Sequence, residues 1–188
     1  MNVPVIRLRE LSLDDVEDRY QWSLDTEVTR HLVVPNQYPP FTRNETKRWI
    51  EMCMNRENGY EQRAIVSEDG VHIGWVDLKN FDKTNKNAEL GIAIGRKEYW
   101  GRGYGLAALH RMLQIGFYEF DLEKVWLRVD ADNVKAMKSY EKAGFVCEGI
   151  MRNDRLRQGI FINRYRYSML KEEYEMLHKK LIKHNYIM

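Results

Sequence analysis

Alternation of apolar and polar residues near the start of the chain predicts a strand followed by a helix. Residues 5–11 alternate with the period of two that is typical of a half-buried strand. Ser12 followed by Asp15 is typical of a helix N-cap with acids in the first turn, and predicts a helix over residues 13–24. Residues 31–41 hold three of the four prolines, so an irregular loop is expected there.

The rest of the chain predicts three hairpin-like strands and then alternating helices and strands. Turn-forming residues at Asp69 and Gly70, and the polar segment 82–87, separate the strand-like runs. The expected elements are a helix from about Asn44, strands over 60–68, 72–81 and 88–95, a helix over 106–120, a strand over 124–131, a helix over 133–145 that Asn133 caps and Gly144 ends, strands over 145–151 and 160–170 around the segment 152–159, and a helix from about Lys171. The fold class predicted is α+β, a mixed, mostly antiparallel sheet of about seven strands flanked by helices.

Length and composition indicate one globular domain. The chain has 188 residues, of which 44% are hydrophobic and 31% charged, and a chain of this size can bury a sizeable core. We expect a single domain over residues 5–170 and a helical tail over 171–188. The tail spaces Tyr174, Leu177 and Leu181 on one helical side, which suits packing back on the domain or forming a homodimer.

Charge, cysteines and the N-terminal segment bear on partners and location. Thirty Lys plus Arg against twenty-eight Asp plus Glu leave a formal charge of +2, which is too balanced for nucleic acid as the main partner. Cys53 and Cys147 lie far apart without metal-ligand spacing, which disfavours a disulfide framework and favours the reducing cytosol. The first residues show no signal peptide or membrane span. We expect a cytoplasmic protein without a nucleic-acid or membrane partner.

The five histidines do not form a metal-binding pattern. They are His31, His72, His110, His178 and His184. No two of them stand four residues apart, and none belongs to a Cys/His cluster, so a metal is not predicted.

Three glycines stand on alternate positions directly before a predicted helix, at Gly101, Gly103 and Gly105. No Lys-Ser or Lys-Thr follows them, which disfavours a nucleoside-triphosphate loop. The dinucleotide fingerprint also fails, because its sixth position is Leu106 and the surrounding strands form hairpins. Two interpretations remain: a tight turn without a ligand, or a loop that gathers N–H groups at a helix N-terminus for a diphosphate.

Two sequence blocks resemble those of the GNAT acetyltransferases. Residues 100–105 (WGRGYG) match the family's [QR]-x-x-G-x-[GA] loop at both small positions, with Trp100 as a departure at the first. Residues 133–145 resemble its N-x-x-A-x-x-x-Y-x-[KR]-x-G-F block, with matches at Asn133, Ala136, Tyr140, Lys142, Gly144 and Phe145. The element order agrees over about residues 5–170. The spermidine and ribosomal-protein N-acetyltransferase branches are most similar, and they also carry a Glu where this chain has Glu89.

The resemblance implies how acetyl-CoA would be bound. The backbone of Ile92, Ala93 and Ile94 would pair with the pantetheine amides. The pyrophosphate would lie on the loop formed by Gly101, Arg102, Gly103, Tyr104, Gly105 and Leu106. Asn133 would contact the cofactor, although capping its helix alone would explain it.

The resemblance also implies two catalytic residues and a direct transfer of acetyl to an amine. Tyr140 would protonate the departing thiolate, and Glu89 would help to remove the proton of the amine. The alternatives are a packed core ring for Tyr140, and a surface carboxylate or a partner of Lys86 for Glu89. The acceptor would be a primary amine of a small molecule or of a peptide or protein N-terminus. A non-catalytic acyl-CoA-binding regulatory module is the competing hypothesis.

The resemblance implies that the loops 29–41 and 152–159 form much of the acceptor site, and both carry few acids. A polyamine would require several carboxylates, but residues 26–44 and 152–159 offer few, which weakens the case for spermidine. The basic residues Arg30, Arg152, Arg155 and Arg157 suit an acceptor with a carboxylate or phosphate. A solvated basic edge is the alternative.

Overall fold

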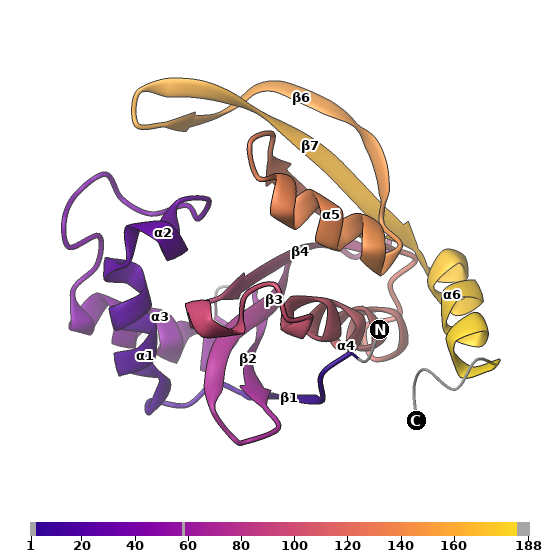
Figure 1. Cartoon of the computed structure of the whole chain (residues 1–188), viewed down its shortest axis with the longest axis horizontal. Helices are drawn as coiled ribbons and strands as arrows, with labels where there is room; N and C mark the ends of the chain where they lie inside the picture. Colours follow the sequence, from indigo (N-terminus) through magenta and orange to yellow (C-terminus); the bar gives the residue numbers. More distant parts are fainter. Residues whose placement is uncertain (1–2, 58, 184–188) are drawn as a thin grey trace.

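The computed structural model describes residues 3–57 and 59–183 (Figure 1). Its strands are β1 (Ile6–Glu10), β2 (Glu61–Ser67), β3 (His72–Asp82), β4 (Asn87–Ile94), β5 (Lys124–Asp130), β6 (Val146–Arg157) and β7 (Ile160–Leu170). Its helices are α1 (Asp15–Leu24), α2 (Thr26–Thr29), α3 (Arg43–Met54), η1 (Lys97–Tyr99), α4 (Tyr104–Tyr118), α5 (Val134–Ala143) and α6 (Lys171–Lys183). The predicted α+β class is confirmed in the described residues.

The strands form one seven-stranded sheet in the order β1-β2-β3-β4-β5-β7-β6. All neighbours are antiparallel except β4 and β5, which run parallel. Their pairing ends after Glu89 and Trp126, and the described residues beyond this point form no further pairs between the two strands. The sheet is therefore opened in its middle, where β4 and β5 diverge.

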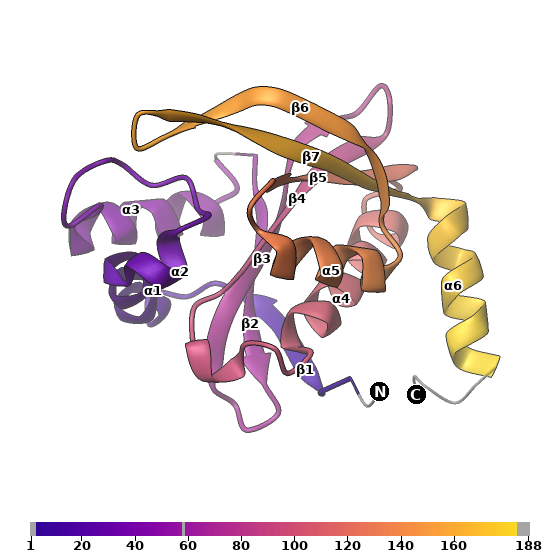
Figure 2. The same cartoon turned by 45° about the horizontal axis from the view of Figure 1, so that its top comes forward.

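Helices lie on both faces of the sheet and cover them differently (Figure 2). On one side, α4 and α5 pack over an apolar face. Leu78, Leu113 and Phe117 are fully buried there, and burying a side chain of this size contributes about 1.5 to 3 kcal/mol. On the other side, α1 and α3 cover only the β1–β3 part of the sheet, where Ile50 and Ala64 belong to a second, smaller core. The remaining part of this second face is left for polar side chains.

Helices α1 and α3 begin for different reasons. At α3, Thr42 forms a capping box: its hydroxyl accepts from the Glu45 N–H, and the Glu45 carboxylate accepts from the Thr42 N–H. At α1, the predicted cap by Ser12 is wrong, because Asp14 is the N-cap and no side chain caps it. The Ser12 N–H instead donates to Asp15 Oδ2 at 2.9 Å.

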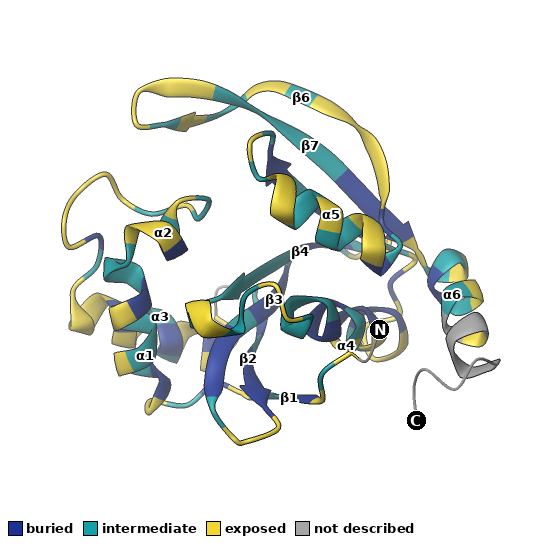
Figure 3. Cartoon of the chain, in the orientation of Figure 1, coloured by how far each residue is buried: buried dark blue, intermediate teal, exposed yellow. Residues whose placement is uncertain are grey.

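The segment 152–159 was expected to be a loop, and this is wrong. The strand β6 continues to Arg157, and the turn consists of Gln158 and Gly159, both with positive φ (50° and 80°). The polar sequence is kept in the strand by its ladder to β7, which shifts register between Met151 and Arg155. Figure 3 shows how much of this long hairpin is exposed.

The tail packs back on the domain through Tyr174. This side chain is 2% exposed, and its ring centroid lies 5.3 Å from that of Phe117 in α4. Residues 184–188 of the expected tail and the side chain of Leu181 lie outside the described part of the chain. Among the helices described, none is long and apolar enough to cross a membrane.

Candidate functional site

A cleft of about 870 Å³ opens where β4 and β5 diverge. On the α5 side its walls include Ile92, Asn133 and Tyr140, and on the opposite side they include Asp77 and Glu89. The cleft therefore brings together both predicted catalytic residues and a predicted backbone-binding strand. The loop between α2 and α3 contributes its rim.

The last residues of β4 leave one edge without a strand partner. Ile92–Ile94 pair with β3 on one side, and beyond Glu89 no described residue of β5 pairs with β4 on the other. Backbone groups of alternate residues point to opposite edges. Since the Gly95 N–H donates to the Ile73 carbonyl of β3 at 2.8 Å, Ala93 also faces β3, whereas Ile92 and Ile94 face the open edge.

Trp100 fixes the end of this strand. Its indole Nε1 donates to the Ile94 carbonyl at 2.8 Å, so that carbonyl has a protein partner and the Ile94 N–H is the group left for a ligand. Sequence reasoning identified Trp100 only as a departure from the family motif. The structure gives it a function: it ties the glycine loop to β4.

The glycine loop leads into the N-terminus of α4. Gly101 and Gly103 have φ of 70° and 89°, a region that favours glycine because it has no Cβ. Tyr104, Gly105 and Leu106 are the first residues of the helix, and their N–H groups have no carbonyl within the helix to bond. A Cβ on Gly105 would meet nothing within 4 Å. The loop is thus an open cradle at the positive end of a helix dipole.

The side chain of Arg102 lies on the surface beside this cradle. Its Nη1 donates to the Glu98 carbonyl at 3.2 Å, and its guanidinium carbon lies 5.7 Å from the ring centroids of Tyr99 and Tyr104. The guanidinium therefore remains close to the loop.

Asn133 and Tyr140 lie on α5 and line the cleft. The Asn133 Oδ1 accepts from the Ala136 N–H at 3.3 Å, which confirms the predicted cap. The Tyr140 ring lies against Phe145 and Tyr167, with centroids 6.0 and 6.3 Å away. Burial raises the pKa of Tyr140 to about 12, so the hydroxyl keeps its proton at neutral pH.

Glu89 is buried and held by two residues that the sequence did not indicate. Arg128 donates through Nε and Nη2 to the two carboxylate oxygens at 2.9 and 2.8 Å. Asn80 donates to Oε2 at 2.7 Å, from a β-bulge where its φ is 52°. The alternative that Lys86 pairs with Glu89 is wrong, because Lys86 Nζ lies 2.7 Å from Asp121 Oδ2.

A row of polar side chains continues from Glu89 across the cleft floor. Asp77 accepts from Lys79 Nζ at 2.9 Å and from Gln62 Nε2 at 3.5 Å. Arg19 of α1 donates to Gln62 Oε1 at 3.1 Å, and its guanidinium carbon lies 3.6 Å from the Trp75 ring centroid. Burial lowers the pKa of Arg19 to about 10. Sequence reasoning did not select Arg19, because nothing local marks it.

Most of the arginines expected at the acceptor site have partners within the protein. Arg155 donates to Asp130 Oδ2 at 2.9 Å, to the His31 carbonyl at 2.9 Å and to the Leu32 carbonyl. Arg157 donates to Asp132 Oδ2 at 2.7 Å. These arginines attach the loop after α2 to the sheet, so their charges are matched within the chain.

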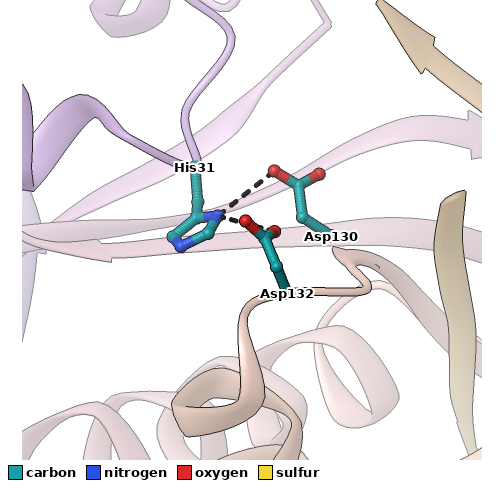
Figure 4. Close-up of side chains that lie close together, drawn as sticks. All are labelled: His31, Asp130 and Asp132. Carbon is teal, nitrogen blue, oxygen red and sulfur yellow. Dashed lines mark hydrogen bonds and ion pairs between the residues drawn. The ribbon is translucent and has the colours of Figure 1, made fainter. Parts of the chain in front are cut away.

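His31 of this loop lies against Asp130 and Asp132 (Figure 4), with ligand-type atoms of the three residues within 4.8 Å of one another. Arg157 donates to both carboxylates, and its hydrogen bond holds the pKa of Asp132 below its usual range. A metal ion would have to compete with these guanidinium groups, so the geometry describes an ion-pair network that fastens the loop.

Comparison with known proteins identifies the class. The family model described as Acetyltransferase (GNAT) domain matches residues 6–146. The chain therefore belongs to the GNAT acetyltransferases, a class of enzymes that transfer an acetyl group to an amine. The resemblance inferred from the two sequence blocks is confirmed.

Two N-acetyltransferases are similar to this chain in sequence, and one solved structure is similar to it in fold. The uncharacterized N-acetyltransferase p20 of Bacillus licheniformis is 29% identical over 173 residues, which is 90% of this chain and 94% of that protein. Spermidine N(1)-acetyltransferase of Escherichia coli K12 is 33% identical over 119 residues, 63% of each chain, so the match spans less than two thirds of that relative. A solved structure of spermidine N-acetyltransferase from Vibrio cholerae, in complex with CoA and spermine, has a TM-score of 0.80 at 23% identity and covers 90% of this chain and 98% of its own. This likeness shows the fold.

Proposed function

We propose that this chain transfers the acetyl group of acetyl-CoA directly to a primary amine of a small molecule or of a peptide or protein N-terminus. The observation that carries the proposal is the opening between β4 and β5, which has a free strand edge on one wall and Tyr140 on the other. Family membership supports acetyl transfer, and a structural neighbour in complex with CoA supports the cofactor.

The open edge of β4 and the start of α4 would hold the cofactor. Backbone groups of Ile92 and Ile94 suit the pantetheine amides, and the unbonded N–H groups of residues 104–106 suit the pyrophosphate. Bound acetyl-CoA supplies the thioester that the amine attacks. Binding would thus depend mainly on the main chain.

The amine must lose a proton before it attacks. Six Arg or Lys against four Asp or Glu stand among the described residues that line the cleft, and positive surroundings disfavour an ammonium ion. We assign to Glu89 the removal of the proton from the acceptor's ammonium group. It would act through a water molecule that donates a hydrogen bond to a carboxylate lone pair not used by Arg128 or Asn80. Both partners hold the carboxylate in one position, as a base needs.

Tyr140 is positioned to donate a hydrogen bond to the departing sulfur. The amine nitrogen forms a bond to the carbonyl carbon, the C–S bond breaks, and the thiolate gains the proton that the amine side gives up. Because burial raises the pKa of Tyr140 to about 12, roughly 3 units above an ordinary thiol, complete transfer to a free thiolate is uphill. The hydroxyl therefore acts by donating a hydrogen bond as the C–S bond breaks.

A polyamine is a less well supported acceptor. The carboxylates on the cleft floor already have cationic partners in the protein: Asp77 has Lys79, Glu89 has Arg128 and Asp130 has Arg155. A polycation would have to displace them. We therefore do not infer spermidine as the acceptor of this chain from the relative that is named for it.

A thiol-release assay with acetyl-CoA and a panel of amines tests the enzyme against the regulatory-module alternative. We expect amine-dependent release of CoA, and a fall in kcat of about 100-fold for Tyr140→Phe. Tyr118→Phe is the matched control, because Tyr118 lies exposed on α4. CoA binding without release for any amine would favour the module, and an unchanged rate for Tyr140→Phe would remove its assignment.

A further inference from the structure

Among the described residues Arg19 forms no ion pair, and the carboxylates of Asp77 and Asp15 attract it only from beyond ion-pair distance. It lines the cleft and is partly buried, and no carboxylate lies within ion-pair distance of it in residues 3–57 and 59–183. Lys79, Arg128 and Arg155 in the same cleft each have one. A buried charge without a counter-charge is costly, so its position calls for an explanation.

The contacts of Arg19 with the described residues orient the guanidinium and leave most of its donors unused. One face lies on Trp75, and one N–H donates to Gln62. A guanidinium carries five N–H donors in a planar fork that matches a carboxylate. Burial lowers the pKa of Arg19 to about 10, so it remains charged at neutral pH. The fork is held ready for an anion.

The register of the sheet gives the distance between Arg19 and the reacting groups. Gln62 pairs with Asp77 across β2 and β3, and Asp77 pairs with Gly91 on β4. Neighbouring strands lie about 4.8 Å apart. Arg19, which contacts Gln62 on β2 and Trp75 on β3, therefore lies one to two strand spacings, about 5 to 10 Å, from the edge of β4 that would hold the thioester.

We propose, resting on the proposed function, that Arg19 binds a carboxylate of the acceptor, whose reactive primary amine lies several bonds away. Acceptors of this class include amino acids with an amine at the end of the side chain, and short acidic peptides. One guanidinium matches one negative charge, whereas a phosphate dianion would be repelled by Asp77 and Glu89 in the same row. A polyamine has no group for Arg19.

Lysine and cadaverine form a matched pair of acceptors, because they differ only in the carboxylate. For the wild-type protein we expect kcat/KM for lysine to exceed that for cadaverine by about tenfold or more. Arg19→Gln should lower the value for lysine about 10- to 100-fold, mainly through KM, and leave cadaverine within about threefold. The control Arg111→Gln removes an exposed arginine of α4 and should change neither acceptor.

The outcome separates this inference from the proposed function. Equal use of lysine and cadaverine, unchanged by Arg19→Gln, would overturn the carboxylate site and leave acetyl transfer intact. If no amine is acetylated, calorimetry can measure the binding of Nε-acetyl-lysine and N-acetylcadaverine in the presence of CoA. Weaker binding of Nε-acetyl-lysine to Arg19→Gln than to the wild-type protein supports the carboxylate site. Equal binding of Nε-acetyl-lysine to the two proteins contradicts it. If that variant does not fold, Arg19→Lys keeps the charge and loses the fork, and should show an intermediate loss for lysine alone.

Discussion

Arg128 of β5 donates hydrogen bonds to both carboxylate oxygens of Glu89 on β4. Glu89 is the last residue of β4 that pairs with β5. Beyond this ion pair the strands diverge and the cleft begins. Glu89 is 6% exposed, so Arg128 and the amide of Asn80 provide the hydrogen bonds that water would give to an exposed carboxylate. The pair thus fixes the inner end of the cleft and the position of the carboxylate proposed to act on the amine.

Removing Arg128 alone should destabilise the protein, because it leaves a buried carboxylate unpaired. We expect Arg128→Met to lower the free energy of unfolding by about 2 to 3 kcal/mol, at the lower end for a buried pair because the Arg128 side chain is 28% exposed. The double variant Arg128→Met with Glu89→Leu should recover most of this loss. Denaturant unfolding measures the stability of both variants. A double variant less stable than the single one would contradict the statement that the unpaired Glu89 carboxylate causes the loss.

Glu89→Gln tests the proposed base separately from stability. The amide keeps the size of the side chain and loses the ability to accept a proton. We expect kcat/KM to fall about 100-fold, with a melting temperature that shows a folded protein. A rate within about twofold of wild type would leave Glu89 as a structural residue only.

Trp100→Phe should weaken cofactor binding without changing the chemical step. An aromatic ring remains, although smaller, but the hydrogen bond to the Ile94 carbonyl is lost, and a single hydrogen bond contributes about 1 kcal/mol. We expect KM for acetyl-CoA to rise about fivefold at nearly constant kcat. Trp126→Phe is the matched control, since its indole donates to Asn87 Oδ1 at 3.0 Å outside the cofactor loop. Equal effects of both variants would contradict a specific role for Trp100.

Arg155→Lys should loosen the loop after α2, which forms part of the rim of the cleft. Lysine keeps a charge near Asp130 but cannot also reach the carbonyls of His31 and Leu32, which the guanidinium bonds together. We expect KM for the acceptor to rise several-fold with KM for acetyl-CoA unchanged. Arg152→Lys, at an exposed position of the same strand, provides the comparison. A parallel rise in both KM values would point to general unfolding instead.

Alkaline pH should destabilise the fold through its buried tyrosines. Burial raises the pKa of Tyr140 and of Tyr174 to about 12, against an unfolded value of about 10. The folded state therefore binds more protons above pH 10, and the stability from this source is complete below pH 10 and is lost as pH rises towards 12. Melting temperatures from pH 8 to 12 should fall most above 10, and Tyr174→Phe should make this fall shallower.

Local sequence predicted most of the fold, including the glycine loop before α4 and the helix that carries Tyr140. Helix α5 and its Asn133 cap follow from periodicity and from a motif that lies within a few residues. The segment 152–159 failed because its polar composition is typical of a loop, while the ladder to β7 keeps most of it in a strand. Strand pairing of this kind cannot be predicted from a short segment of sequence, because it depends on a second strand.

The contacts of Arg128, Asn80 and Arg19 in the cleft could not be predicted for a related reason. Arg128 is 39 residues from Glu89, and Arg19 is 43 residues from Gln62. Each pair meets only once the sheet has formed, and arginines are common on surfaces, so neither residue is distinctive in the sequence. Asn80 donates to Glu89 from a β-bulge in which its φ is positive. No sequence motif predicted this bulge.

The most direct test of direct acetyl transfer is a single-turnover experiment with acetyl-CoA and an amine, in which released thiol, acetylated amine and the mass of the intact protein are measured together. We predict one acetylated amine for each thiol released, no acetylated protein at any time, and formation of both products about 100-fold more slowly in Tyr140→Phe. An acetylated protein that forms before the amine is added, or acetyl-CoA that binds and is never consumed, would contradict the proposed reaction.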